Sequence, residues 1–199
     1  MFRLRAATVH DLPGAYRVCL LTGDAGQDAS ALYRDPDLLG HIFVGPYIVG
    51  QPDHAFVLSD EAGVAGYCLA ASDSRDFERW AEATWWPALR AHLPVLDDGS
   101  PDADLIRIIN EPERASDAVI GAYPSQIHID LLARARSQGF GRQMIETQLD
   151  RLRRSGSPGV HLEVDARNAN AIDFYRHLGF VEVERPDGSL LMGLRLSEA

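Results

Sequence analysis

The chain has 199 residues, 46% of them apolar, and a formal net charge of −10 at pH 7. This length and apolar content are enough to bury one substantial core, so we expect a single domain over residues 1–199. The acidic balance argues against a nucleic-acid partner, no apolar run approaches the roughly 20 residues of a membrane span, and no secretory pattern is visible, which favours a cytoplasmic protein.

The predicted elements begin with a strand over residues 2–7. Thr8, with Asp11 three residues later, resembles a capping pair at the start of a helix. That helix carries its inward-facing residues at Leu12, Ala15, Tyr16 and Cys19. Cys19 and Cys68 are far apart and lack metal-ligand spacing, so we expect reduced thiols and no metal site.

The next stretch is predicted to be mostly loop. Residues 24–52 are rich in Gly, Pro and Asp and contain an apolar run over 38–49, which predicts a short second helix and a long loop. Residues 54–59 and 64–71 then have the pattern of a β-hairpin, turned by Asp60-Glu61-Ala62-Gly63.

Residues 72–124 have helical patterns. Apolar and aromatic residues recur at helical spacing from Phe77 to Trp85, until Pro87 is expected to kink or end the helix. A second helix is predicted to start at Ser100-Pro101. Aromatic residues at helical spacing more often form core than a pocket wall. Trp86 lies off that stripe, so it is the candidate substrate-binding residue.

A glycine turn between a strand and a helix is the first functional motif. Residues 126–132 alternate polar and apolar side chains through Asp130, and residues 140–154 change to a helical period. Gly139 and Gly141 lack a Cβ, so the backbone between these elements can approach a bulky anion closely. The first amides of a helix have no partner within it, and the helix dipole makes that end electropositive. The pattern favours a backbone-lined pyrophosphate site.

A second motif follows a strand predicted over residues 160–164. The glycine turn fits the pattern (Gln or Arg)-x-x-Gly-x-(Gly or Ala) at Arg136, Gly139 and Gly141. The later stretch fits Asn-x-x-Ala-x-x-(aromatic or aliphatic)-Tyr-x-x-x-Gly-Phe at Asn168, Ala171, Phe174, Tyr175, Gly179 and Phe180. With both motifs, residues 126–180 resemble the GNAT family of N-acetyltransferases. Tyr123-Pro124-Ser125, which leads into the strand, also resembles the acetyltransferase-like domain attached to some O-GlcNAc hydrolases.

The resemblance implies an α/β (α+β) GNAT fold, in which helices flank a mixed, mostly antiparallel central sheet completed by strands at 180–184 and 190–196. It implies acetyl-CoA as the cofactor, with loop amides on the pyrophosphate and strand backbone groups on the pantetheine arm and the thioester carbonyl. Asn168 would cap its helix and contact the arm. The implied cofactor-binding residues are Leu131, Leu132, Arg136, Gln138, Gly139, Phe140, Gly141, Arg142 and Asn168.

The same resemblance assigns the acceptor side. In the family, the region of residues 24–52 covers one side of the acceptor cleft. Residues 72–124 exceed what a minimal member needs between its third and fourth strands, so we expect a helical insertion on the substrate side that sets specificity.

Three residues are the catalytic candidates. By resemblance, Tyr175 protonates the departing thiolate. Asp130 and His128 lead as the base that deprotonates an ammonium acceptor, because strand alternation places them with Gln126 on one face. A half-buried aspartate or a neutral histidine would each serve, and Glu163 on the next strand is a third option, so the base stays open.

The sequence therefore predicts an acetyl-CoA-dependent N-acetyltransferase that acts by direct transfer, without metal, on an amine of a small molecule or a protein. A small molecule is favoured because nothing resembles an extended peptide groove. The alternative is a non-catalytic acetyl-CoA- or CoA-binding module, which predicts binding without turnover. Another phosphate-ligand enzyme is disfavoured, because Arg142-Gln143 stands where a Walker Lys-Ser or Lys-Thr would be. Homodimers occur in the family, but the sequence identifies no interface.

Overall fold

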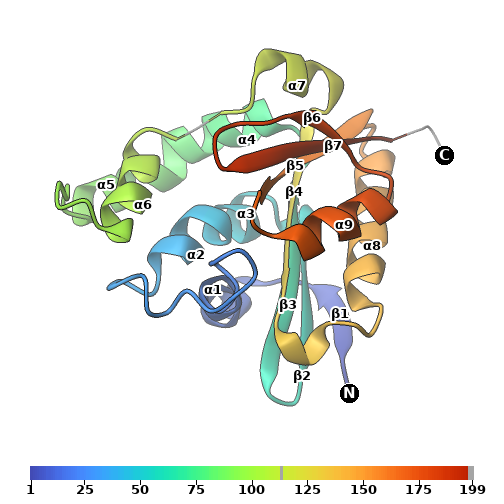
Figure 1. Cartoon of the computed structure of the whole chain (residues 1–199), viewed down its shortest axis with the longest axis horizontal. Helices are drawn as coiled ribbons and strands as arrows, with labels where there is room; N and C mark the ends of the chain where they lie inside the picture. Colours follow the sequence, from blue (N-terminus) through green and yellow to red (C-terminus); the bar gives the residue numbers. More distant parts are fainter. Residues whose placement is uncertain (113, 197–199) are drawn as a thin grey trace.

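The computed structural model describes residues 1–112 and 114–196 (Figure 1). Its centre is a seven-stranded sheet in the order β1-β2-β3-β4-β5-β7-β6. The strands span Arg3–Ala6 (β1), Ala55–Asp60 (β2), Gly63–Ala71 (β3), Ser125–Leu131 (β4), Gly159–Asp165 (β5), Val181–Glu184 (β6) and Ser189–Arg195 (β7). Neighbouring strands pair antiparallel except β4 and β5, which run parallel. The predicted mixed, mostly antiparallel sheet is confirmed.

Helices cover both faces of this sheet (Figure 1). They span Leu12–Leu20 (α1), Leu38–Phe43 (α2), Gly45–Gly50 (α3), Ser74–Trp80 (α4), Trp86–His92 (α5), Pro101–Asn110 (α6), Asp117–Ala122 (α7), Phe140–Arg154 (α8) and Ala169–His177 (α9). Short 3-10 turns lie at Val9–Asp11, Pro52–His54 and Ala133–Ala135, and a π-helical segment at Ala81–Trp85. Within the described ranges, no helix is long and apolar enough to cross a membrane.

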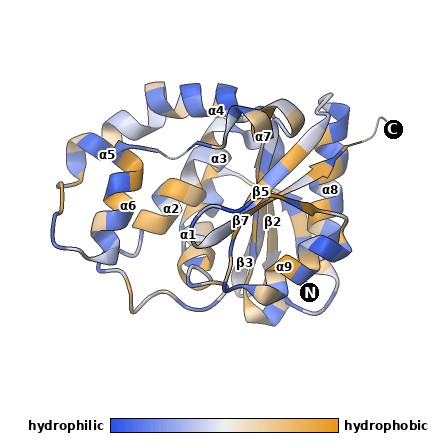
Figure 2. Cartoon of the chain, turned by 45° about the horizontal axis from the view of Figure 1, so that its top comes forward, coloured by the Kyte–Doolittle hydropathy of each residue, from blue (hydrophilic) through white to orange (hydrophobic). Residues whose placement is uncertain are grey.

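Two apolar clusters form the core, one on each side of the sheet. Alternation along β3 divides its side chains, because Tyr67 and Leu69 join the cluster under α1 and α2, whereas Cys68 and Ala70 join the cluster under α8 and α9. Figure 2 shows polar residues on the outer sides of α4 and α8, with apolar residues toward the strands. The predicted period of α8 is confirmed, since its buried residues include Met144, which is fully buried.

The sheet opens between β4 and β5. Their described register contains only Ser125 with Val160 and Gln126 with His161, after which the strands separate. The Leu132 N–H donates to the Ala65 carbonyl at 2.8 Å, on the β3 side. Because consecutive residues of an antiparallel pair alternate in direction, the backbone groups of residues 127, 129 and 131 point into this gap. We refer to it as the β4–β5 opening.

The structure differs from two expectations about helices in part. Residues 38–50 form two short helices rather than one, with Val44 between them and Pro46 in the first turn of α3. Pro87, expected to kink or end its helix, does not end it: the regular α-helix changes to a π-helical segment just before Pro87, which then lies in the first turn of α5. The π-helical segment before α5 keeps the chain helical from α4 onward. The predicted helical insertion between the third and fourth strands is confirmed.

Candidate active site

A cavity of about 940 Å³ lies at the β4–β5 opening. Residues 126–130 of β4 and 161–165 of β5 form two of its walls. The helical insertion contributes Phe77, Glu78, Ala81, Glu82, Trp86 and Ile108. Tyr175 and Asn168, from the second sequence motif, also line the cavity. The opening, the insertion and the second motif therefore meet around one space.

The glycine turn has the backbone geometry of an anion cradle. Ser137 has φ 59° and Gly139 has φ 83°, so two residues of the turn occupy the left-handed region. Gly139 is the N-cap of α8, and a Cβ built on it would meet nothing within 4 Å, so its backbone angle, not crowding, favours glycine. At Gly141 an added Cβ would lie 3.3 Å from Leu131 and 3.4 Å from Phe174. This close packing fixes the start of α8 beside the end of β4.

The side chains of the loop are engaged within the protein. Arg136 donates from Nε to the Leu131 carbonyl at 2.7 Å and from Nη2 to the Gly26 carbonyl at 2.9 Å. Three further loop side chains also have partners. Gln138 donates to the Arg134 carbonyl at 2.7 Å, the Phe140 ring lies 5.0 Å from the Phe2 ring, and Arg142 donates to Glu146 at 3.4 Å. What the loop offers a ligand is therefore chiefly its backbone.

The two residues at the end of β4 that are predicted to hold the cofactor, Leu131 and Leu132, point their backbone groups in opposite directions. The Leu132 N–H is bonded to Ala65 and points away from the β4–β5 opening, which corrects the expectation for that amide. Leu131 faces the opening, although its carbonyl accepts from Arg136. Ile129 also faces the opening, and sequence reasoning missed it, because only the pairing of β4 with β3 shows which residues point which way.

Tyr175 is held on α9 with its hydroxyl at the cavity. The Asn168 side chain accepts from the Ala171 N–H at 3.1 Å and caps this helix, as expected. Tyr175 is 8% exposed and packs against Phe174 and Phe180. Burial, followed by the nearby Asp130 charge, raises the pKa of Tyr175 well above its usual value. The raised pKa keeps the hydroxyl protonated at neutral pH. Among the described residues this hydroxyl has no hydrogen-bond partner, so its proton is available to a ligand.

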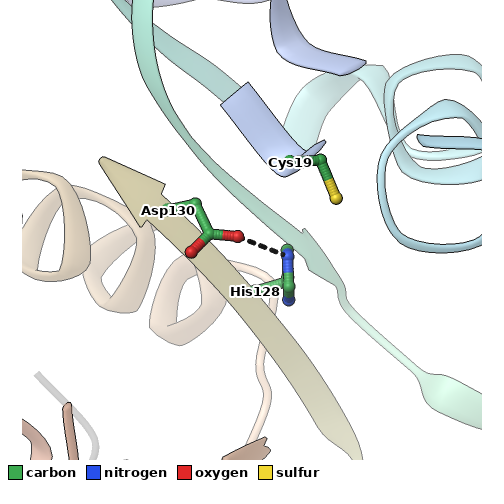
Figure 3. A group of neighbouring side chains, drawn as sticks. All are labelled: Cys19, His128 and Asp130. Atoms are coloured by element: carbon green, nitrogen blue, oxygen red, sulfur yellow. Dashed lines mark ion pairs between the residues drawn. The ribbon is translucent and has the colours of Figure 1, made fainter. Parts of the chain in front are cut away.

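The two candidate bases share a hydrogen-bond network. The Tyr67 hydroxyl donates to Asp130 Oδ2 at 2.6 Å and lies 2.8 Å from His128 Nε2. His128 Nε2 lies 3.1 Å from the same Asp130 oxygen. Figure 3 shows this pair, with Cys19 of α1 beside it. The His128 ring also stacks with the rings of Phe43, at 5.8 Å, and of Tyr67, at 5.3 Å.

The same cluster raises the question of a metal. Potential ligand atoms of Cys19, His128 and Asp130 lie within 4.8 Å of one another. The Tyr67 hydroxyl, however, already donates to Asp130 Oδ2 and lies at hydrogen-bond distance from His128 Nε2. Burial raises the pKa of the Cys19 thiol to about 12, which disfavours the thiolate that binds metals. We therefore interpret the cluster as a hydrogen-bond network.

Asp130 differs from three acids around the cavity that pair with arginines, although Glu163 and Glu184, which accept hydrogen bonds from serines, also line it. Glu78 pairs with Arg75 at 2.9 Å, Glu82 with Arg90, and Asp165 with Arg167 at 2.8 Å. Asp130 pairs instead with a histidine and a tyrosine. It is thus a negative charge at the cavity with no arginine partner among the described residues, suited to a cationic group.

The remaining candidates are placed as follows. Trp86 is 7% exposed and belongs to the core cluster under α1 and α2, yet it also lines the cavity. The Glu163 side chain accepts from the Ser189 hydroxyl. His161 is buried and bonds to the Tyr123 carbonyl at 2.8 Å, a structural role. Sequence reasoning missed Tyr67, since its place in a strand carries no sign that it faces Asp130.

Comparisons with known proteins converge on one family. The model described as the acetyltransferase (GNAT) family matches residues 117–180. The rat (Rattus norvegicus) Protein O-GlcNAcase is 26% identical over 192 residues, which cover 94% of this chain but only 21% of that protein, so the chain spans about a fifth of the curated relative. The crystal structure of SsHAT is 33% identical, with a TM-score of 0.92 and 99% of both chains covered.

A further structure shows a shared fold at low sequence identity. It is yncA, a putative acetyltransferase from Salmonella typhimurium, solved with its cofactor acetyl-CoA. It is 16% identical to this chain, with a TM-score of 0.56 and coverage of 100% of this chain and 95% of that one.

Proposed function

Because this chain belongs to the acetyltransferase (GNAT) family, we propose that it is an acetyl-CoA-dependent N-acetyltransferase that acts on an amine. The observation that carries the proposal is the β4–β5 opening, which has the glycine cradle at one end and Tyr175, His128 and Asp130 around its cavity.

The residues present fit acetyl-CoA. Ser137 and Gly139 have left-handed backbone angles just before α8, whose first amides lack partners within the helix and would be satisfied by a pyrophosphate. The backbone groups of Ile129 and the Leu131 N–H point into the opening and would pair with an amide-bearing arm. Acetyl-CoA supplies, when bound, an acetyl group activated as a thioester.

The chain's own residues would then manage the protons. An ammonium acceptor must first lose one proton to become a nucleophile. Its nitrogen then bonds to the acetyl carbon and loses a second proton as the carbon–sulfur bond breaks. The sulfur must gain one proton, so one proton is released overall. We assign the first task to the pair of His128 and Asp130 and the last to Tyr175, whose raised pKa keeps its proton in place.

The acceptor side is proposed to be the helical insertion. Phe77, Trp86 and Ile108 give the cavity an apolar wall, while Asp130 supplies a negative charge. These features suit an amine on an apolar body, of a small molecule or of a protein.

The test is calorimetric titration with acetyl-CoA, combined with thiol release in the presence of 2-phenylethylamine, spermidine, glucosamine or a lysine-containing peptide. Binding with acceptor-dependent release supports the transferase. Saturable binding with no release for any amine would favour a non-catalytic acetyl-CoA-binding module, and no binding would refute both.

A further inference from the structure

We propose that His128 is the general base, that it accepts the proton at Nδ1, and that Tyr67 and Asp130 are positioning residues that hold its ring in the Nε2-protonated tautomer. The inference rests on the proposed function, because it assigns the base that the transfer requires.

The tautomer follows from counting protons. A tyrosine hydroxyl has one proton, and an ionised carboxylate can only accept. The Tyr67 oxygen lies 2.6 Å from Asp130 Oδ2, so its proton is used there. His128 Nε2 lies 2.8 Å from the same tyrosine oxygen and 3.1 Å from Asp130 Oδ2. Both neighbours are then acceptors toward the ring, so Nε2 must carry the proton and the lone pair of the neutral ring is on Nδ1.

The ring is fixed in this orientation by stacking. The rings of Phe43 and Tyr67 each stack on it, with interplanar angles of 18° and 21°. The Nε2 edge faces the hydroxyl and the carboxylate. Nδ1 has no hydrogen-bond partner among the described residues, and the side chain lines the cavity with 31% of its surface exposed. An amine entering the cavity would therefore meet Nδ1.

Asp130 is better suited to orienting His128 than to accepting the amine proton itself. Its Oδ2 already receives Tyr67 and His128, and a proton on this carboxylate would remove the charge to which both donors point. When His128 takes the amine proton, the imidazolium that forms lies beside this carboxylate and is stabilised by it. A carboxylate that orients a catalytic histidine acts in the same way. The Nδ1 proton can then return to solvent through the cavity.

The other titratable groups around the ring do not compete. They are Cys19 of α1, Tyr67 of β3 and, beyond Asp130, Tyr175 of α9. Burial raises the pKa of all three, so each stays protonated through the neutral range. None of the three therefore competes with His128 for the amine proton at neutral pH.

Three substitutions separate the roles, with kcat/KM measured across pH using the amine of the panel above that gives the fastest thiol release. His128→Gln keeps a donor near Nε2 but has no base, so kcat/KM should fall on the order of 100-fold or more. Asp130→Asn and Tyr67→Phe each affect two of the three contacts of the network, and each should lower kcat/KM by about tenfold. Acetyl-CoA affinity should stay within about twofold in all three, since none touches the glycine cradle.

The matched control is His92→Gln, at the exposed end of α5 and outside the cavity lining. A second readout needs no acceptor: nitrogen-15 spectra of the imidazole rings should show the Nε2–H tautomer for the signal that disappears in His128→Gln. If His128→Gln stays near wild type while Asp130→Asn loses more than about 100-fold, Asp130 is the base and the inference is overturned. A dominant Nδ1–H tautomer would overturn it as well. A wild type that binds acetyl-CoA but releases no thiol would refute the proposed function instead, and the tautomer would still be read independently.

Discussion

Replacing Tyr175 by phenylalanine tests the proposed acid at the one atom that matters. The ring packs against Phe174 and Phe180, and the substitution leaves those contacts in place. The hydroxyl has no hydrogen-bond partner among the described residues, so its loss should change the free energy of unfolding by less than about 1 kcal/mol. If this hydroxyl donates the proton to the departing thiolate, its removal should lower kcat by about 100-fold or more.

The assay is steady-state thiol release, together with urea unfolding and acetyl-CoA calorimetry on the same preparations. We expect a large fall in kcat with the affinity for acetyl-CoA and the unfolding midpoint nearly unchanged. Because burial raises the pKa of Tyr175, wild-type activity should not be lost on the basic side until well above neutral pH. A variant that keeps kcat within about twofold of wild type would show that the proton comes from elsewhere and refute the assignment.

Three further outcomes are expected. Gly139→Ala places a side chain on a residue with φ 83°, so it should weaken acetyl-CoA binding by about tenfold or more. The control Gly99→Ala, at φ 65° in a remote turn, introduces a similar backbone strain and should not change the affinity. Equal losses of affinity in calorimetry would contradict a role of the glycine turn in binding. The hydrogen bond from Arg5 lowers the pKa of Asp11 to about 2, so this pair should contribute about 1–2 kcal/mol above pH 4 that is lost as the pH falls toward 2. Urea unfolding of Asp11→Asn should then show a smaller loss between pH 7 and pH 3 than wild type. Trp86→Ala removes a buried ring and should cost about 3–5 kcal/mol of stability, whereas Trp86→Phe should fold and raise the acceptor KM at unchanged acetyl-CoA affinity.

Much of the local structure could be predicted because the patterns that specify it are local. The helical period after the glycine turn predicted residues 140–154, and these are the bounds of α8. The hairpin of β2 and β3 followed from alternation on either side of a short turn. The break between α2 and α3 and the position of Pro87 in the first turn of α5 depend on packing against the rest of the fold. Neither has a comparable periodic signal in the sequence.

The sequence by itself determined the face of β4 that carries His128 and Asp130, the cap at Asn168 and the turn at Gly139, because each depends on neighbours within a few residues. Only the tertiary structure decided what those groups do together. The register of β3 against β4 sets Tyr67 opposite Asp130, and the separation of β5 from β4 leaves the backbone of Ile129 facing the β4–β5 opening. These contacts join segments roughly 60 residues apart, such as Tyr67 and His128. Strand pairing is set by burial of whole faces across the sheet, so no local pattern could have shown them.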